Sequence, residues 1–194
     1  KVDLDGAAGG TGWRGPWRIE TGAAAVRFDP AGLAYGPLSV RGGSLRVHPK
    51  HDQDRINLVR DIEGRMGLDE TTMWMSYLVR PDTVGIGDVF VVPNDYVFAA
   101  VGKNWGQNFA LYTSASSVRM EKGRTHLVVA RFDFDEGDEA WLWIDPPLDR
   151  EPKKSEAVQG LRTEIGSGSR VRIQLQGYGQ GDYRLDELRL GASW

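Results

Sequence analysis

The sequence contains no cysteine in its 194 residues, which excludes disulfides, thiol catalysis and cysteine-based zinc sites together. No apolar run approaches the roughly 18 residues of a membrane-spanning helix, so we expect no transmembrane segment. No stretch is strongly basic either, because 24 Lys and Arg stand against 27 Asp and Glu, for a formal net charge of −3. A dedicated nucleic-acid-binding domain normally shows a basic field, and we therefore expect no nucleic-acid partner.

Glycine, by contrast, is abundant, with 25 residues where about 7% of a chain is usual. This excess favours many turns over long helices. The length predicts a single domain over residues 1–194, large enough to bury a core without a disulfide or metal. The sequence starts at Lys1 and stops at Trp194, and we interpret it as a module cut from a longer or processed chain. A signal peptide removed from such a chain would not be visible.

The dominant hydrophobic period along the chain is two. In segment 125–134, Val128, Ala130, Phe132 and Phe134 share one face, as is typical of a half-buried strand. Further strand candidates are 72–80, 89–92, 96–101, 109–112, 140–144, 171–176 and 183–190. Segment 53–66 fits a helix and a strand equally. Turn residues separate the candidates, so we predict an all-β antiparallel sandwich of the jelly-roll type with very little helix.

Several segments resemble a known family when they are taken in order. They are the opening GWRGPW at 12–17, the apolar TTMWMSYLVR at 71–80, the paired strands 126–134 and 140–146, and the ending LDELRLG at 185–191. Together they are similar to the LamG-like, concanavalin A-like jelly rolls in large secreted or surface proteins of bacteria such as planctomycetes and verrucomicrobia. The resemblance spans nearly the whole chain and implies an extracellular or cell-surface location. That superfamily includes lectins, carbohydrate-binding modules, glycosidases, lyases and adhesive modules, so the fold alone leaves function open.

Glycosidases of the laminarinase type on this fold carry a Glu-x-Asp-x-x-Glu motif, in which the first Glu is the nucleophile. Retaining hydrolysis needs two carboxyl groups about 5–5.5 Å apart. The most similar stretch is RFDFDE at 131–136, where Arg131 takes the place of the nucleophile. A guanidinium group cannot form a glycosyl ester. Since His48, His51 and His126 lie in no lyase motif either, we predict a chain without catalytic residues.

The segment 133–139 contains five carboxylates in seven residues. Calcium takes six to eight oxygen ligands, and domains of the lectin-like family that this chain resembles often bind it. The candidate calcium ligands are Asp133, Asp135 and Asp138. The same residues also fit an ordinary hairpin turn in which Gly137 adopts a positive φ. We prefer the plain turn and keep a structural Ca²⁺ as the alternative.

Sugar binding needs exposed aromatic rings beside short polar side chains, because a pyranose ring stacks its C–H face while its hydroxyl groups form hydrogen bonds. The glycine-bounded loop 102–108 has this composition. Tyr112 ends the next strand candidate, and Arg80 ends the most apolar one. The candidate ligand-binding residues are therefore Trp105, Asn104, Gln107, Asn108, Tyr112 and Arg80. The alternative for Trp105 is a buried side chain that anchors its loop.

The other tryptophans favour structural interpretations. We expect Trp13 and Trp17 to pin the N-terminal segment to the core, and Trp74 to lie in the core. Trp141 and Trp143 share one face of their strand and either line a groove or pack under a loop. The leading hypothesis is therefore a non-catalytic, lectin-like module of a larger extracellular protein that binds a polysaccharide. The second is a structural or adhesive module that contacts neighbouring domains or another copy of itself.

Overall fold

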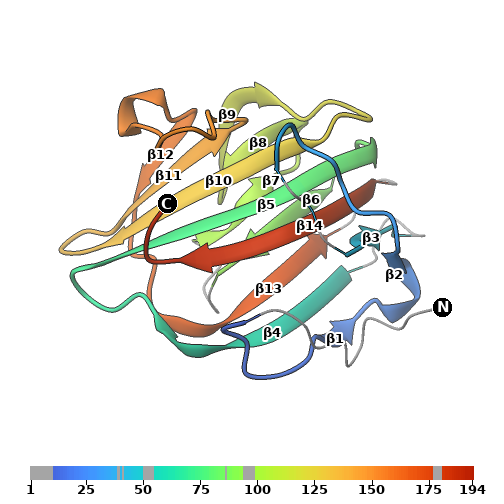
Figure 1. Ribbon diagram of the computed structural model, residues 1–194, viewed down its shortest axis with the longest axis horizontal. Coiled ribbons are helices and arrows are strands. Elements are labelled where there is room, and N and C mark those ends of the chain that lie inside the picture. The colour runs from blue at the N-terminus through green and yellow to red at the C-terminus, as the bar shows by residue number, and fades with distance from the viewer. Residues whose placement is uncertain are drawn as a thin grey trace.

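Two seven-stranded antiparallel sheets pack face to face in the computed structural model (Figure 1). The structure describes residues 11–38, 40, 42–49, 55–85, 87–93, 99–176 and 181–194. Helical structure is confined to short 3₁₀ turns in those ranges, among them η1 (Ala23–Ala25) and η3 (Lys154–Glu156). None of them is long enough to cross a membrane. The predicted all-β jelly-roll sandwich with very little helix is confirmed.

We name each sheet after a central strand. The β5 sheet has the order β12 (Gln159–Arg162), β11 (Glu139–Ile144), β10 (His126–Phe134), β5 (Thr71–Thr83), β14 (Asp182–Gly191), β3 (Ser44–Val47) and β2 (Val26–Asp29). The β13 sheet has the order β1 (Arg18–Thr21), β4 (Arg55–Met66), β13 (Gly168–Gln176), β6 (Asp88–Val92), β7 (Val101–Lys103), β8 (Asn108–Leu111) and β9 (Ser114–Arg119).

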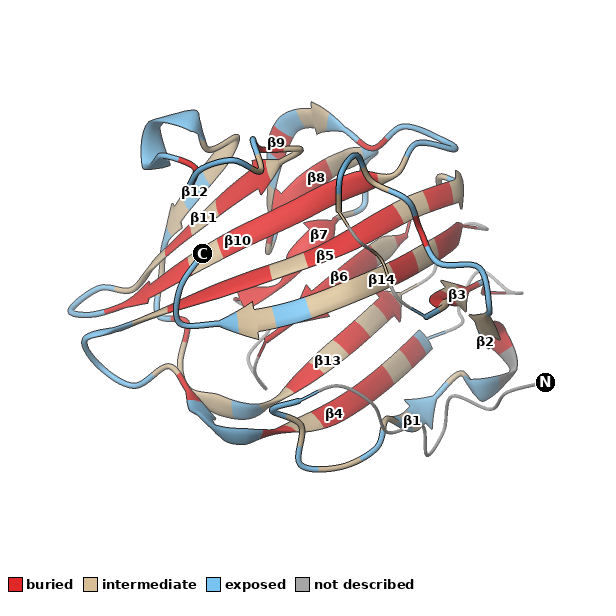
Figure 2. Ribbon diagram, viewed as in Figure 1, coloured by how far each residue is buried: buried red, intermediate tan, exposed pale blue. Residues whose placement is uncertain are grey.

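The main core lies between the sheets and follows the period of two. Three of its members have no exposed surface, namely Ala130 and Phe132 of β10 and Leu58 of β4. Ile173 of β13 faces them and is almost fully buried. Buried positions alternate with less buried ones along β13 and β4 (Figure 2). The face that carries Val128 and Ala130 therefore packs in the core, but the prediction of a half-buried strand over 125–134 is wrong, because the other face with Leu127 and Val129 is buried as well.

A second apolar cluster covers part of the outer face of the β5 sheet. Its buried members are Leu33, Trp74, Leu78, Leu127, Val129 and Trp143. The rings of Trp74 and Trp143 stack with centroids 5.6 Å apart, and Trp143 Nε1 donates to the Lys153 carbonyl oxygen at 2.9 Å. Trp141 packs against the same cluster. Of the two interpretations of Trp141 and Trp143, packing under a loop is confirmed.

The N-terminal tryptophans hold a buried arginine at the edge of the β13 sheet. The Trp13 and Trp17 ring centroids lie 6.1 Å apart, and the Arg60 guanidinium carbon is 4.7 Å from the Trp13 ring. Arg60 Nε donates to the Gly15 carbonyl oxygen at 2.8 Å. Burial lowers the pKa of Arg60. The two rings therefore attach the N-terminal segment to the sandwich, as expected.

Two strand expectations have further outcomes. The ambiguous segment 53–66 forms the long strand β4 from Arg55 onward, where β1 and β13 pair with it from either side. Pairing on both edges makes this segment a strand, although its local sequence fits a helix equally well. Of the strand expected over 96–101, residues 96–98 lie outside the described residues. Ala99 and Ala100 are not in a strand, so the prediction is wrong there, and β7 begins at Val101.

Candidate functional site

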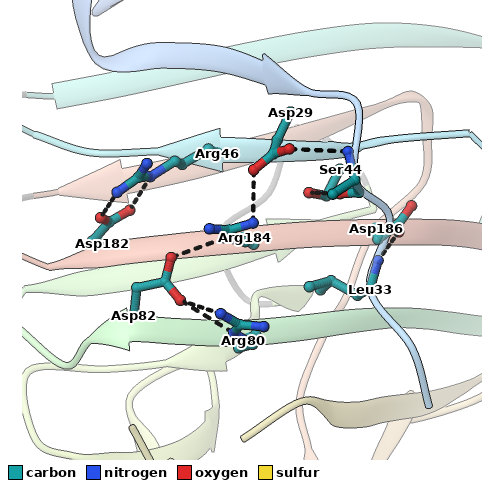
Figure 3. A network of polar contacts seen from close by, with 10 residues as sticks. Asp29, Leu33, Ser44, Arg46, Arg80, Asp82, Asp182, Arg184 and Asp186 are labelled. Carbon is teal, nitrogen blue, oxygen red and sulfur yellow. Dashed lines mark hydrogen bonds and ion pairs between the residues drawn. The ribbon is translucent and has the colours of Figure 1, made fainter. Parts of the chain in front are cut away.

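The outer face of the β5 sheet is occupied by the chain itself. Beside the apolar cluster under the loops lies a network of ion pairs (Figure 3). Arg184 donates to Asp82 at 2.8 Å and to Asp29 at 2.6 Å, and Arg46 Nε donates to Asp182 at 2.9 Å. These charges satisfy one another, and the hollow of about 370 Å³ that remains on this face is lined mostly by apolar side chains, with Trp74 and Trp194 among them.

Arg80 belongs to this network. Its guanidinium group donates to Asp82 at 3.0 and 3.1 Å from the outer face of β5. Trp105 follows β7 in the opposite sheet. The structure therefore does not bring Arg80 together with the other candidate ligand-binding residues.

The outer face of the β13 sheet has a different character. One row of cross-strand partners joins Asn57 of β4, Gln174 of β13, Phe90 of β6, Gly102 of β7 and Ala110 of β8. Such partners project from the same face. A Cβ atom on Gly102 would lie 2.0 Å from the Val89 carbonyl oxygen, so only glycine fits there. The small side chains at one end of this row leave room above the sheet.

That room is a hollow of about 220 Å³, which we call the Trp105 hollow. Its lining residues are Asp88, Phe90, Ala100, Asn104, Trp105, Tyr112, Thr113 and Gln174. Three aromatic residues and two residues with amide side chains thus converge on one place. Its volume is below the range of enclosed small-molecule pockets, which suits contact with one face of a ring better than complete enclosure.

Trp105 lies on the tip of the β7–β8 hairpin and is 52% exposed. It is one of three exposed large hydrophobic side chains in the described part of the chain, with Leu68 and Trp194. This exposure contradicts the alternative that Trp105 is a buried loop anchor. An indole at the rim of a hollow is placed to stack on a ligand.

Tyr112 occupies a backbone conformation that side chains rarely adopt, with φ at 49°. It lies in the tight turn between β8 and β9, and its N–H donates to the Ala100 carbonyl oxygen at 2.7 Å. A non-glycine residue in the left-handed region costs on the order of 1–3 kcal/mol, and such residues cluster at functional sites. The strained turn keeps the phenol ring beside the hollow.

The side chains of the three candidate amide residues form hydrogen bonds within the β7–β8–β9 segment. Asn104 Nδ2 donates to the Thr113 carbonyl oxygen at 3.0 Å, and Asn108 Nδ2 donates to that of Ser116 at 2.8 Å. Gln107 accepts a hydrogen bond from Arg119. Of the three, Asn104 alone lines the hollow. These contacts indicate that the amides stiffen the support under Trp105.

Lys103 is a site residue that the sequence analysis missed. It is completely buried, and its ammonium group donates to the Gly87 carbonyl oxygen at 2.5 Å and to that of Asn104 at 3.0 Å. It therefore ties the start of β6 to the base of the Trp105 hairpin. Burial lowers its pKa to about 8, against the attraction of Asp88. The sequence could have indicated this burial, because Lys103 lies two residues after Val101 and therefore points to the same, inward face of the strand.

We expect the free energy of unfolding to report this buried amine. The pKa of Lys103 is about 8 when folded and about 10.4 in an unfolded chain, so the unfolded state holds more protons between these values. Stability should therefore rise with pH across that window, by on the order of 1–3 kcal/mol. In urea unfolding measured from pH 7 to 10, the free energy of unfolding of the native protein should rise relative to that of Lys103→Met. The exposed Lys122→Met is the control, and a pH-independent difference for Lys103→Met would contradict the assignment.

Asp88 is the charged group in the Trp105 hollow. Its Oδ1 atom is buried and accepts no hydrogen bond within the described residues. Burial raises its pKa to about 6, while the charge of Lys103 acts in the opposite direction. At neutral pH the hollow therefore contains a carboxylate whose charge is poorly solvated.

Two of the three candidate calcium ligands, Asp133 and Asp138, are engaged with the protein itself, and Asp135 is exposed. Asp133 forms ion pairs with Arg131 at 2.8 Å and with Lys154 at 2.9 Å, and Asp138 accepts the Ile165 N–H at 2.8 Å. Gly137 has a φ of 89°, as the hairpin interpretation requires. Within the described residues, no three His, Asp or Glu side chains are placed to hold a metal ion. The contacts favour the plain turn.

Chelation tests the plain turn directly. We expect excess EDTA to leave the melting temperature unchanged, because two cations already neutralise Asp133. A bound ion would stabilise the native state by mass action and its removal would lower the melting temperature. Protein loaded with Ca²⁺ beforehand is the control, and a fall in its melting temperature on chelation would restore the calcium site.

His126, Tyr35 and Arg124 meet around Asp145. His126 Nδ1 lies 2.9 Å from Asp145 Oδ2, and its Nε2 accepts the Glu121 N–H at 3.3 Å. Both ring nitrogens are therefore used. The imidazole is only 1% exposed, so a substrate has no access to it, and the grouping fastens the start of β10.

No protein-family model and no curated protein sequence matches this chain. Several solved structures match its fold. An endo-β-1,4-glucuronan lyase from the fungus Trichoderma reesei has a TM-score of 0.57 at 10% identity, over 94% of this chain and 92% of that one. Cellulose induced protein Cip1 scores 0.53 at 13% identity, over 91% of both chains. The Emp47p carbohydrate recognition domain scores 0.50 at 10%, over 99% of this chain and 93% of that one. These matches share the antiparallel jelly-roll sandwich fold of this chain.

Proposed function

We propose that this chain is a carbohydrate-binding module that holds a polysaccharide on the outer face of the β13 sheet. The observation that carries the proposal is the half-exposed Trp105 at the rim of a hollow that Tyr112 also lines. A sugar ring would stack on the indole. Gln174 and Asn104 lie within reach of its hydroxyl groups, since both line the same hollow.

The rest of the molecule supports this choice of face. Loops and ion pairs fill much of the opposite outer face. The strain at Tyr112 and the buried Lys103 fix the hairpins that carry the aromatic rings. A rigid platform suits recognition, because little conformational freedom is lost on binding.

We propose further that the module is non-catalytic and belongs to a larger extracellular protein of the LamG-like type. Arg131 stands where a laminarinase-type nucleophile would be, and it pairs with Asp133 at 2.8 Å. His126 is enclosed by its partners. The extracellular location rests on the family resemblance of the segments at 12–17 and 185–191.

A polysaccharide panel tests the proposal. We expect affinity electrophoresis to show retardation by at least one neutral or acidic polysaccharide, with a matching change in tryptophan emission. No reducing ends or unsaturated products should accumulate. A silent panel together with concentration-dependent size in light scattering would instead support a structural or adhesive module. Sustained turnover would contradict the non-catalytic assignment.

A further inference from the structure

We propose that the polysaccharide carries free amino groups, as polymers of glucosamine do, and that the Trp105 hollow binds one of its ammonium groups between aromatic rings and Asp88. This inference rests on the proposed function, because it names the kind of sugar that the same hollow binds. One sugar ring would stack on Trp105 while its ammonium group enters the hollow toward Asp88.

The charge of the hollow is negative. Asp88 is the only charged side chain among the described residues that line it, and the others are three aromatic residues, two amides, an alanine and a threonine. Asp88 begins β6 and lies two residues before Phe90, so both project from the same, outer face of the strand. A ligand in the hollow therefore meets a carboxylate and, among these lining residues, no positive group.

The protein compensates the charge of Asp88 only in part. Its Oδ1 atom is buried and accepts no hydrogen bond from the described residues. Lys103 attracts this carboxylate, but the Gly87 and Asn104 carbonyl oxygens hold its ammonium group. Burial outweighs that attraction and leaves the pKa of Asp88 raised, at about 6. A cation in the hollow would supply the compensation that the protein leaves incomplete.

The walls of the hollow also suit a cation. Its aromatic residues are Phe90, Trp105 and Tyr112, and the face of an aromatic ring attracts a cation within about 6 Å, most strongly when the ring is tryptophan. An ammonium group has three donors. The amide oxygen of Gln174, which pairs with Phe90 across the strands, is a second acceptor beside Asp88. A sugar that carries a carboxylate would instead be repelled by Asp88.

The test compares three β-1,4-linked oligosaccharides of equal length that differ only at carbon 2 of each sugar. This carbon carries a hydroxyl, an acetamido or a free amino group, and calorimetry measures the affinity near pH 7, where Asp88 is mostly ionised. We expect the amino form to bind about tenfold more tightly than either neutral form. The neutral forms should bind too, since stacking on Trp105 needs no amine. The preference should shrink as salt is raised toward about 1 M.

Three variants locate the preference. Asp88→Asn removes the charge at nearly constant size, so the amino form should fall to the affinity of the hydroxyl form, whose own binding should not change. Asp88→Glu keeps the charge and should retain part of the preference, which controls for a change in fold. Asp149→Asn makes the matched change at an exposed position between β11 and β12 in the other sheet, and the full preference should remain.

The outcomes separate this inference from the proposed function. Equal binding of the three forms, or an unaltered preference in Asp88→Asn, would overturn the role of Asp88 while the polysaccharide site stands. Binding of spermine as tight as that of the amino form would show general cation binding and would also overturn it. If none of the three forms binds but another polysaccharide of the panel does, this inference alone fails. If the whole panel is silent as well, the proposed function itself fails.

Discussion

Replacing Trp105 by alanine is expected to weaken polysaccharide binding at least about 30-fold and to leave the melting temperature nearly unchanged. Removal of an aromatic anchor from a binding site commonly costs about 2 kcal/mol or more, and 1.4 kcal/mol corresponds to a factor of ten. The side chain is 52% exposed, and substitutions at exposed positions usually change stability by less than about 0.5 kcal/mol. Calorimetry and thermal unfolding of the one variant measure both quantities.

Trp105→Phe is the matched control, because it keeps an aromatic face at the same position. It should retain most of the affinity. If Trp105→Ala bound as tightly as the native protein, the stacking role would be withdrawn. A large fall in its melting temperature would instead return Trp105 to the class of residues that anchor a loop.

Trp143→Ala is expected to have the opposite profile, with a loss of stability of roughly 3–5 kcal/mol, as for other large aromatic side chains removed from a packed site. The residue is 2% exposed, stacks on Trp74 and donates a hydrogen bond to Lys153. For a chain of this size the loss corresponds to a fall of about 6–20 °C in the melting temperature.

Differential scanning calorimetry with and without polysaccharide checks this second result. The affinity of the folded Trp143→Ala protein, measured well below its melting temperature, should match that of the native protein, since Trp143 lies on the other sheet. A melting temperature within 2 °C of the native value would show that the loop over the β5 sheet does not depend on this ring. Trp74→Ala tests the partner of the stack.

The strands could be predicted because a strand that packs one face in the core carries an apolar residue at every second position. Val128, Ala130 and Phe132 share the face of β10 that packs in the main core, although the other face of this strand is buried too. Trp105 could be selected because an aromatic residue in a polar, glycine-bounded loop has nothing apolar next to it. Its exposure in the structure agrees with that argument.

The rest of the site depends on which distant strands pair, and local sequence does not contain that information. Phe90 and Gln174 face each other from strands that are 84 positions apart. Arg80 was chosen because it ends the most apolar strand candidate, yet that strand lies in the sheet opposite the one that carries Trp105. Lys103 looks like a solvated loop residue until Gly87 is placed next to it.

The place of β14 in the β5 sheet bears on how the protein is made. This C-terminal strand pairs with β5 on one edge and with β3 on the other, and Arg184 reaches Asp29 across 155 positions. During synthesis, β5 (Thr71–Thr83) is made about 100 residues before β14 (Asp182–Gly191). The edge of β5 that pairs with β14 therefore stays unpaired over that interval. Contacts of such long range fold slowly, and open edges invite pairing with other chains. The β5 sheet is thus open to pairing with other chains until β14 is complete.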